Sequence, residues 1–280
     1  MTYTVYDAHS FGRGSGETIG SMGDTTETGL PQALEIAWGM RAAPQRGPSR
    51  ALTHDRIVAA AIEIADADGL GAVTMQAVAK SLDFTTMSLY RYVSGKDDLV
   101  RLMQDAAVSL PDEVELPDDW RDALRTWAGL VRDAYRARPW VLEAPRGQWS
   151  VLMPSSVRAA DLGLAALADL ELTDGEKIAA ILLISLHVAS MVQLEQSLAE
   201  EGEVTATPAG VEMLREVITT ERFPHLGPVM AAGGYVTGAD PGVEVDPDEV
   251  AGVDAEFDLG LDVLIAGLEA IERRRRPSCG

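Results

Sequence analysis

Apolar residues recur at helical spacing along most of the chain after residue 50. The first clear stripe consists of Ile57, Ala61 and Ala65. It follows Thr53, a favourable N-cap residue, and precedes Gly69, a residue type that commonly ends helices. The spacing therefore predicts an amphipathic helix between these two signals.

Two shorter amphipathic segments follow, at residues 74 to 82 and 85 to 93, and the tight turn at Asp83 and Phe84 separates them. Another helix is predicted from Ser94, since the Ser94-Gly-Lys-Asp stretch matches a capping box. The pattern thus predicts four closely spaced helices in this region.

Longer helices are predicted in the rest of the chain. They cover residues 118 to 138, 154 to 170, 174 to 200, 208 to 221 and 255 to 276, and a capping box at Thr173 and Glu176 opens the third. Residues 1 to 30 and 224 to 252 lack periodicity; the former are expected to be disordered and the latter irregular. Since no segment has a convincing strand pattern, the predicted fold class is all-α, with a helix-turn-helix unit before a helical bundle.

Composition fits a cytoplasmic protein of one large or two ordinary domains. The chain has 280 residues, 46% of them hydrophobic. Its only cysteine is Cys279, so no intrachain disulfide forms and a reducing compartment is expected. The longest apolar run, residues 178 to 192, is too short to span a bilayer comfortably, and no secretory signal is visible at the N-terminus. We therefore expect no membrane contact.

The charge is strongly negative but unevenly distributed. The chain carries 23 basic and 44 acidic side chains, a net charge of −21, which taken alone argues against nucleic acid as a partner. Residues 41 to 104 nevertheless hold eight basic and seven acidic residues, so this window is nearly neutral. A near-neutral N-terminal module thus precedes a very acidic one.

The two short helices have the spacing of a helix-turn-helix, in which the second helix enters the major groove of DNA. At its N-terminal end Thr86, Ser88 and Arg91 can face outward, while Leu89 and Val93 face the preceding helix. A generic helical subdomain with a solvated face has the same spacing, so the spacing alone leaves both interpretations open.

Three residues around this segment favour DNA. Exposing the rings of Tyr90 and Tyr92 to solvent is energetically unfavourable, whereas their phenol groups can donate hydrogen bonds to phosphates. Lys96 lies in a first helical turn, where a cation opposes the helix dipole. A lysine beside the free N–H groups of a helix start is a suitable anion site, and a DNA phosphate is the natural anion.

Two other classes of function are compatible with a helical chain of this composition. One is a small-molecule-binding or catalytic helical protein, and another is an adaptor that binds a protein partner through its acidic part. The four histidines are His9, His54, His187 and His225, and no two have metal-ligand spacing. No nucleophile elbow, phosphate-binding loop or dinucleotide fingerprint is present. We therefore expect no metal, no cofactor and no enzymatic activity.

The stretch "HDRIVAAAIEIADADGLGAVTMQAVAKSLDFTTMSLYRYVSGKDDL" resembles the DNA-binding domain of the TetR family of one-component bacterial regulators. The resemblance covers about residues 51 to 104. It rests on Gly69, Thr74, Ala77 to Ala79, Leu82, Ser88 to Tyr92, Lys96 and Leu99. The family usually has glycine where Asp83 stands, a small departure because aspartate tolerates the left-handed conformation fairly well.

The resemblance implies residue roles and domain limits. Bases are expected to be contacted by Gln76, Thr86, Met87 and Arg91, and phosphates by Thr74, Ser88, Tyr90, Tyr92 and Lys96. The expected division is an N-terminal extension at 1–50, a DNA-binding domain at 51–104 and a C-terminal domain at 105–280. The implied function is regulation of transcription, most often repression, through a palindromic operator in double-stranded DNA.

The resemblance also implies that the C-terminal domain binds a small effector and forms a homodimer. Candidates for a largely apolar effector pocket are Trp127, Tyr135, Trp140, Trp149, Met153, His187 and Met191. Candidates for the dimer interface are Leu261, Leu264, Ile265 and Leu268. In the alternative interpretations the aromatic residues are ordinary core and His187 is a hydrogen-bonded core histidine. The two apolar helices, at residues 174 to 200 and 255 to 276, are then buried within one subunit.

Two arginine-rich segments flank the predicted domains. Arg41, Arg46 and Arg50 precede the DNA-binding domain and can form an arm in the minor groove, or simply belong to a flexible linker. Residues 273 to 276 are four arginines, which can bind nucleic acid or complement the negative end of the last helix.

Overall fold

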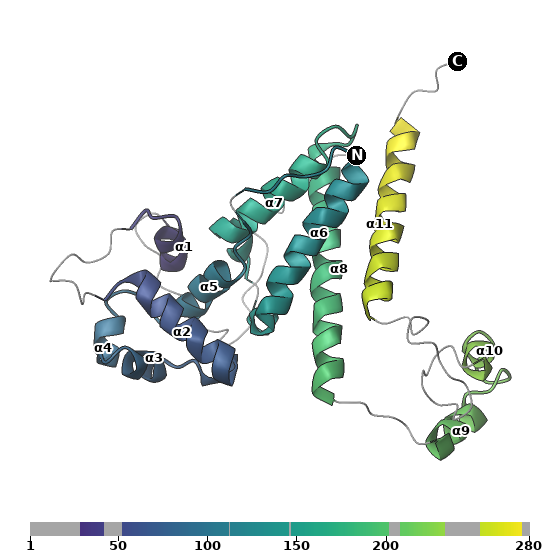
Figure 1. Ribbon diagram of the computed structural model, residues 1–280, viewed down its shortest axis with the longest axis horizontal. Coiled ribbons are helices and arrows are strands. Elements are labelled where there is room, and N and C mark those ends of the chain that lie inside the picture. The colour runs from purple at the N-terminus through teal and green to yellow at the C-terminus, as the bar shows by residue number, and fades with distance from the viewer. Residues whose placement is uncertain are drawn as a thin grey trace, which may run out of the picture.

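The computed structural model describes residues 29–41, 52–111, 113–145, 147–201, 208–232 and 253–275. Within these ranges the regular elements are helices, which confirms the all-α fold class. An N-terminal group of short helices lies beside a bundle of longer ones (Figure 1). The expected disorder of residues 1 to 28 and most of the segment 224 to 252 fall outside the described residues. The described part of the latter segment was expected to be irregular but contains a short helix, Leu226–Ala231.

The N-terminal domain begins with α2 (His54–Asp68) and the 3₁₀ turn η1 (Leu70–Ala72). As predicted, the Thr53 hydroxyl accepts a hydrogen bond from the Arg56 N–H at 3.2 Å, and Gly69 ends the helix with a φ of 79°. A left-handed φ favours glycine because it has no Cβ atom. Both ends of this helix are therefore determined locally.

The helix-turn-helix consists of α3 (Met75–Ser81) and α4 (Thr86–Leu89). Asp83 adopts a φ of 63° in the turn between them, as expected for a residue in the place of a glycine. The second helix is shorter than the predicted segment 85 to 93. Beyond Leu89 the Tyr92 N–H donates to the Leu89 carbonyl at 2.8 Å, so the chain tightens into a turn.

The helix α5 (Lys96–Ala107) continues beyond the domain boundary expected at residue 104. The capping interaction predicted between Ser94 and Asp97 is wrong. The Ser94 hydroxyl instead donates to buried Asp98, which also accepts from Arg101 at 3.0 Å. The deeper carboxylate is used because it faces the core side of the turn, where its desolvation is offset by two hydrogen bonds.

Substitutions at Asp83 test the conformation of the turn. We expect Asp83→Val to destabilise the protein by about 1–2 kcal/mol, since a β-branched residue tolerates a positive φ poorly. Asp83→Gly should be neutral or slightly stabilising for the same reason. Urea unfolding of the two variants measures the difference, and equal stability of both would contradict the left-handed assignment.

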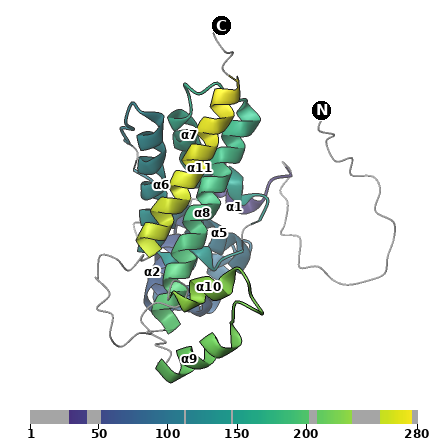
Figure 2. The same ribbon diagram turned by 90° about the vertical axis from the view of Figure 1, so that its right-hand side faces the viewer.

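The C-terminal domain consists of α6 (Trp120–Ala137), α7 (Pro154–Ala166), α8 (Asp174–Glu201) and α11 (Val253–Arg275), with 3₁₀ turns η2 (Pro139–Leu142) and η3 (Ser150–Leu152). The helix α8 packs against α6, α7 and α11. It runs alongside α11, while α9 (Pro208–Val217) and α10 (Leu226–Ala231) lie beyond one end of the bundle (Figure 2). The Thr173–Glu176 capping box is confirmed by hydrogen bonds in both directions.

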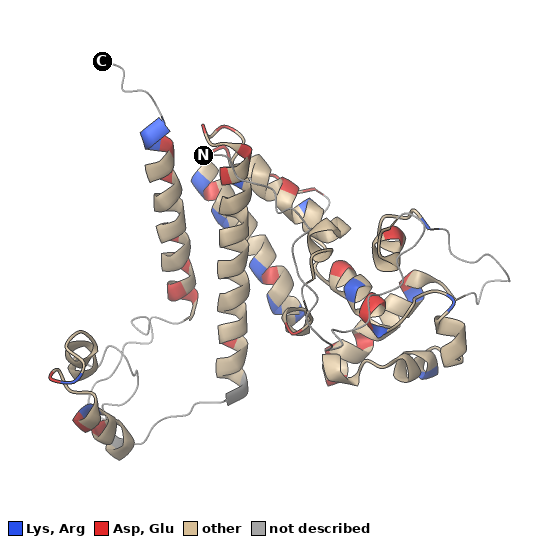
Figure 3. Cartoon of the chain, turned by 180° about the vertical axis from the view of Figure 1, so that it is seen from behind, with Lys and Arg blue, Asp and Glu red and all other residues tan. Residues whose placement is uncertain are grey.

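A network of four charged side chains ties α6, α8 and α11 together. Arg132 and Arg136 of α6 both pair with Glu195 of α8 and with Asp254 of α11. Hydrogen bonding to Arg136 lowers the pKa of Glu195, although burial opposes the shift. Charged residues gather on α6 and α11, whereas the middle of α8 is nearly uncharged (Figure 3).

The arginines at the C-terminus complement the end of α11. The guanidinium groups of Arg273 and Arg274 donate to the Glu269 and Ala270 carbonyls at 3.3 and 3.1 Å. Arg275 forms an ion pair with Glu176 at 2.8 Å. These contacts agree with the interpretation that the tail neutralises the negative end of the helix.

A further helix, α1 (Gln32–Ala37), lies in the N-terminal extension. It packs on α5, and its residues Ala33 and Leu34 are buried in the core of the N-terminal domain. Arg41 lies 3.9 Å from Glu35 in an ion pair. Arg46 and Arg50, the other arginines of the expected arm, lie outside the described residues.

Candidate nucleic-acid interface

The helix-turn-helix presents a polar face formed by both of its helices. Thr74, Gln76, Met87, Tyr90, Arg91 and Lys96 are exposed, while Thr86 and Ser88 are half-buried. Leu89 and Val93 are fully buried, as the pattern predicted. The structure thus brings eight of the nine expected DNA contacts to exposed or half-exposed positions around α3, α4 and the start of α5.

Local hydrogen bonds explain how this face is built. The Thr74 hydroxyl accepts from the Ala77 N–H at 3.0 Å and so caps α3. The hydroxyls of Thr85 and Ser88 lie 2.9 Å apart at the start of α4. The α4 helix is held against α3 by Leu89, so Met87 and Arg91 project from the opposite side.

Two features of this face leave side chains available for a partner. Met87 is 74% exposed, an unusual state for a large apolar side chain in the middle of a short helix. Arg91 and Lys96 form no ion pair with any residue that the structure describes; in the C-terminal domain Arg121, Arg125 and Arg132 do, whereas Lys177, Arg222 and Arg274 do not. The cations on this face are therefore free to meet an external anion.

Tyr92 differs from the expectation of an outward tyrosine. Its side chain is only 9% exposed and packs edge-on against the His54 ring. The tightened turn after Leu89 directs it inward, where its ring gains more from burial than from solvent. Tyr90 is exposed, in agreement with the prediction.

The expected effector residues do not gather in one place. Trp140 and Met153 belong to the core cluster of the N-terminal domain, and Trp149 packs against it. Trp127 belongs to the cluster of the C-terminal bundle, and Met191 packs against it. Tyr135 packs against both clusters, which makes it the one candidate at their junction.

Hydrogen bonds show what several of these residues do in the fold. The Trp127 indole donates to the Ala159 carbonyl at 2.8 Å, and the ring leaves no room for a Cβ atom at Gly163. The His187 ring stacks on Phe257 and its Nε2 atom lies 2.9 Å from the Phe257 carbonyl. Trp127 is therefore a core residue, and His187 is a half-buried histidine held by a hydrogen bond.

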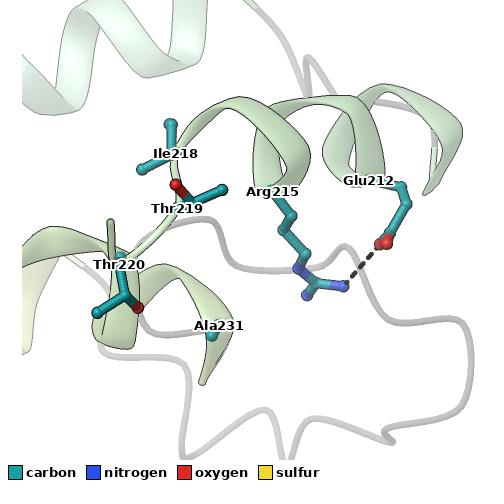
Figure 4. Close-up of a pocket in the computed structure, with 7 residues that line it drawn as sticks. Glu212, Arg215, Ile218, Thr219, Thr220 and Ala231 are labelled. Atoms are coloured by element: carbon teal, nitrogen blue, oxygen red, sulfur yellow. Dashed lines mark ion pairs between the residues drawn. The ribbon is translucent and has the colours of Figure 1, made fainter. Parts of the chain in front are cut away.

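A cavity of about 330 Å³ lies between α9 and α10 (Figure 4). It is lined by Glu212, Arg215, Ile218, Thr219, Thr220, Gly227 and Ala231. Arg215 pairs with Glu212 at 3.5 Å along its wall. None of the seven expected effector residues lines this cavity, and its walls are too polar for the apolar pocket that was predicted.

Of the residues expected at the dimer interface, Leu261, Ile265 and Leu268 have little exposed surface. All three are buried in the core of their own subunit, because α11 packs one face against α8. Leu264 is half-buried at the edge of that contact. The outward apolar surface, hereafter the α8–α11 stripe, consists instead of Ile178, Leu182, Leu183, Leu186, Leu194, Leu198, Leu259 and Val263.

One carboxylate at the joint between the domains was not anticipated. Asp66 on α2 accepts hydrogen bonds from the Trp140 indole at 2.7 Å and from Arg138 at 3.2 Å. The sequence offers no signal for this contact, since the partners are more than seventy residues apart. It fixes the end of α6 and the turn η2 against the N-terminal domain.

Taken together, the compact helix-turn-helix with free cations and the separate helical bundle define a helix-turn-helix transcriptional regulator. Residues 57–103 match the family described as bacterial regulatory proteins, tetR family, and residues 110–271 match the tetracyclin repressor-like C-terminal domain. The chain belongs to the TetR family.

Known relatives cover nearly the whole chain. It is 36% identical to the HTH-type transcriptional repressor DrrR1 of Streptomyces coeruleorubidus, over 98% of this chain and 97% of that protein. An HTH-type transcriptional regulator of Saccharopolyspora erythraea is 29% identical, over 88% and 95%. Among solved structures, the TetR family protein ActR of Streptomyces coelicolor in complex with actinorhodin has a TM-score of 0.61 and 25% identity, over 81% and 98%.

Proposed function

We propose that this protein is a ligand-responsive repressor that binds a palindromic operator in double-stranded DNA as a homodimer. The exposed face of α3 and α4 carries the proposal. On it, Arg91 and Lys96 lack ion-pair partners among the described residues, and Met87 is exposed beside them. Repression is the mode named for DrrR1, the relative that matches nearly the whole chain.

The residue roles follow from where the side chains lie. Gln76, Thr86, Met87 and Arg91 contact bases, while Thr74, Ser88, Tyr90 and Lys96 contact phosphates. Arg91 can bind the O6 and N7 atoms of a guanine with two hydrogen bonds, and Met87 can touch a thymine methyl group. Tyr92 supports the domain mainly from its core, and only the exposed edge of its side chain is left for a phosphate.

Homodimerisation is supported by the α8–α11 stripe. Eight large apolar side chains on two adjacent helices are too many for a free surface of a soluble protein. The helix α8 is also long and apolar enough to cross a membrane by length and composition. Burial of its outer face against a partner's α8 and α11 accounts for that composition in a cytoplasmic protein, as an intermolecular four-helix bundle.

An apolar small-molecule effector is proposed for the C-terminal domain, with no cofactor and no catalytic activity. The support is by likeness, because ActR is described in complex with actinorhodin. Tyr135, at the junction of the two core clusters, is the residue best placed to sense such a ligand. An effector releases DNA by favouring a conformation in which the two DNA-binding domains are wrongly spaced.

A gel-shift experiment tests the function. Labelled DNA from upstream of the protein's own gene and of its neighbours is titrated with protein at about 0.1 M salt. We expect one fragment to shift at nanomolar protein and to resist a large excess of unrelated DNA, since specific binding exceeds non-specific binding by about 10³-fold or more. The absence of any specific shift at micromolar protein would instead favour an adaptor or a binding protein without DNA.

A further inference from the structure

The helix α1 connects the DNA-binding domain to the C-terminal domain through two hydrogen bonds. The Gln32 side chain donates to the Tyr92 carbonyl at 3.1 Å, directly after the recognition helix α4. The Trp38 indole donates to the Leu152 carbonyl at 2.8 Å, in the turn η3 that precedes α7. A helix of six residues thus has one end on each domain.

The packing of α1 also spans both domains. Ala33 and Leu34 are buried in a cluster that contains Leu99 of α5 and also Trp140 and Met153 of the C-terminal domain. Trp38, by contrast, is 44% exposed, so its main contribution is the hydrogen bond and not the burial of its ring. A tryptophan left half in water at this position is difficult to explain by stability alone.

Other hydrogen bonds also connect the two domains, but on the N-terminal side they involve α2 and α5 and not the segment after α4. Trp140 reaches Asp66 on α2, Gln104 reaches the Val141 carbonyl, and Asp105 accepts from the Ser155 N–H. Among the described residues these contacts involve α2 and α5, whereas α1 holds the carbonyl that follows the recognition helix. His54 lies 3.0 Å from that same carbonyl oxygen, so this point of the chain is held from two sides.

We propose that α1 is a strap that sets the angle of the DNA-binding domain on the bundle, with Gln32 and Trp38 as its positioning residues. This inference rests on the proposed function. Binding of two half-sites requires both recognition helices at a separation of about 34–36 Å. If the DNA-binding domains can rotate on the bundle, then after one of them has bound its half-site the effective concentration of the other at the second half-site is lower. The family matches, which begin at residue 57, do not include the strap.

The test compares a full palindromic operator with a single half-site. Trp38→Phe removes the indole N–H and keeps an aromatic ring, and Gln32→Leu removes the amide at the other end. Each variant should bind the full site about fivefold or more weakly, and the half-site within about twofold of the unmodified protein. A half-site is bound by a single DNA-binding domain. The angle of that domain on the C-terminal bundle therefore does not affect the affinity for a half-site.

A matched control separates positioning from folding. Trp127→Phe removes an indole hydrogen bond that lies wholly within the C-terminal domain. Any loss of folded protein in this variant lowers binding to full and half sites by the same factor. Equal losses on both sites, or no loss on either, for Trp38→Phe and Gln32→Leu would overturn the strap.

Failure of the proposed function would look different. If the unmodified protein bound the full palindrome no better than the half-site, the proposed binding of a palindrome by a dimer would itself be wrong. If it strongly preferred the full site and the strap variants kept that preference, only the strap would be wrong. Thermal unfolding of each variant confirms that comparisons are made on folded protein.

Discussion

Arg91→Ala should weaken binding to the operator by about 10- to 100-fold and relax the preference for one base pair, since a bidentate arginine–guanine contact contributes about 1–3 kcal/mol. Arg91 is exposed after α4, and no described residue pairs with it. Arg91→Lys keeps the charge but loses the planar pair of donors, so it should recover general affinity without recovering the base preference.

Lys96→Ala should behave differently from Arg91→Ala. Lys96 opens α5, and an ammonium group beside the free N–H groups of a helix start can bind a phosphate. Its removal should weaken all DNA sequences alike and flatten the salt dependence by about one unit of slope. The two variants thus separate base recognition from phosphate binding on one face.

Titrations at several salt concentrations, on the operator and on operators with single base changes, measure both effects. Lys177→Ala is the matched control, because Lys177 donates to the Ala168 carbonyl far from the DNA-binding domain. Full affinity in Arg91→Ala and Lys96→Ala together would show that this face does not contact DNA.

Leu186→Glu should separate the proposed dimer into monomers and abolish the simultaneous binding of both half-sites. Leu186 lies in the α8–α11 stripe, and a two-fold axis would place two new carboxylates in the interface. An uncompensated buried charge costs about 3–5 kcal/mol, so the dissociation constant should rise by more than about 100-fold. Val263→Glu on α11 should act in the same direction.

Sedimentation at micromolar protein measures the expected change from dimer to monomer. Val151→Glu places the same charge on an exposed apolar position in η3, outside the stripe, and should leave the dimer intact. A dimer that survives Leu186→Glu and Val263→Glu would remove the stripe from the interface. Half-site binding by the monomeric variant shows whether its DNA-binding domain remains folded.

The N-terminal domain could be predicted closely because its signals are local. The Thr53 cap, the Gly69 stop and the left-handed Asp83 each act within a few residues of the chain. The exposed and buried sides of α4 also follow from one helical turn. Where the prediction failed, at Tyr92 and at the Ser94 cap, a single change of turn geometry redirected the side chain.

The effector pocket could not be predicted from the clustering of tryptophans along the sequence. Trp127 and Trp140 lie on consecutive elements, yet they enter different cores, because α6 ends at Ala137 and η2 turns toward Asp66. Closeness in sequence within a bundle does not decide which of two neighbouring cores a large side chain fills.

Most of the helices, the Thr53 and Thr173 caps and the polar side of α4 follow from the amino-acid sequence alone, because these depend on contacts within about one turn of the chain. Which apolar face of α8 and α11 is internal and which stays exposed depends on the packing of the helices against each other. The chain has apolar residues on both faces of α11, so Leu259 and Leu261 are equivalent until the helix packs. Packing buries Leu261 and leaves Leu259 exposed, a choice set by residues distant in sequence.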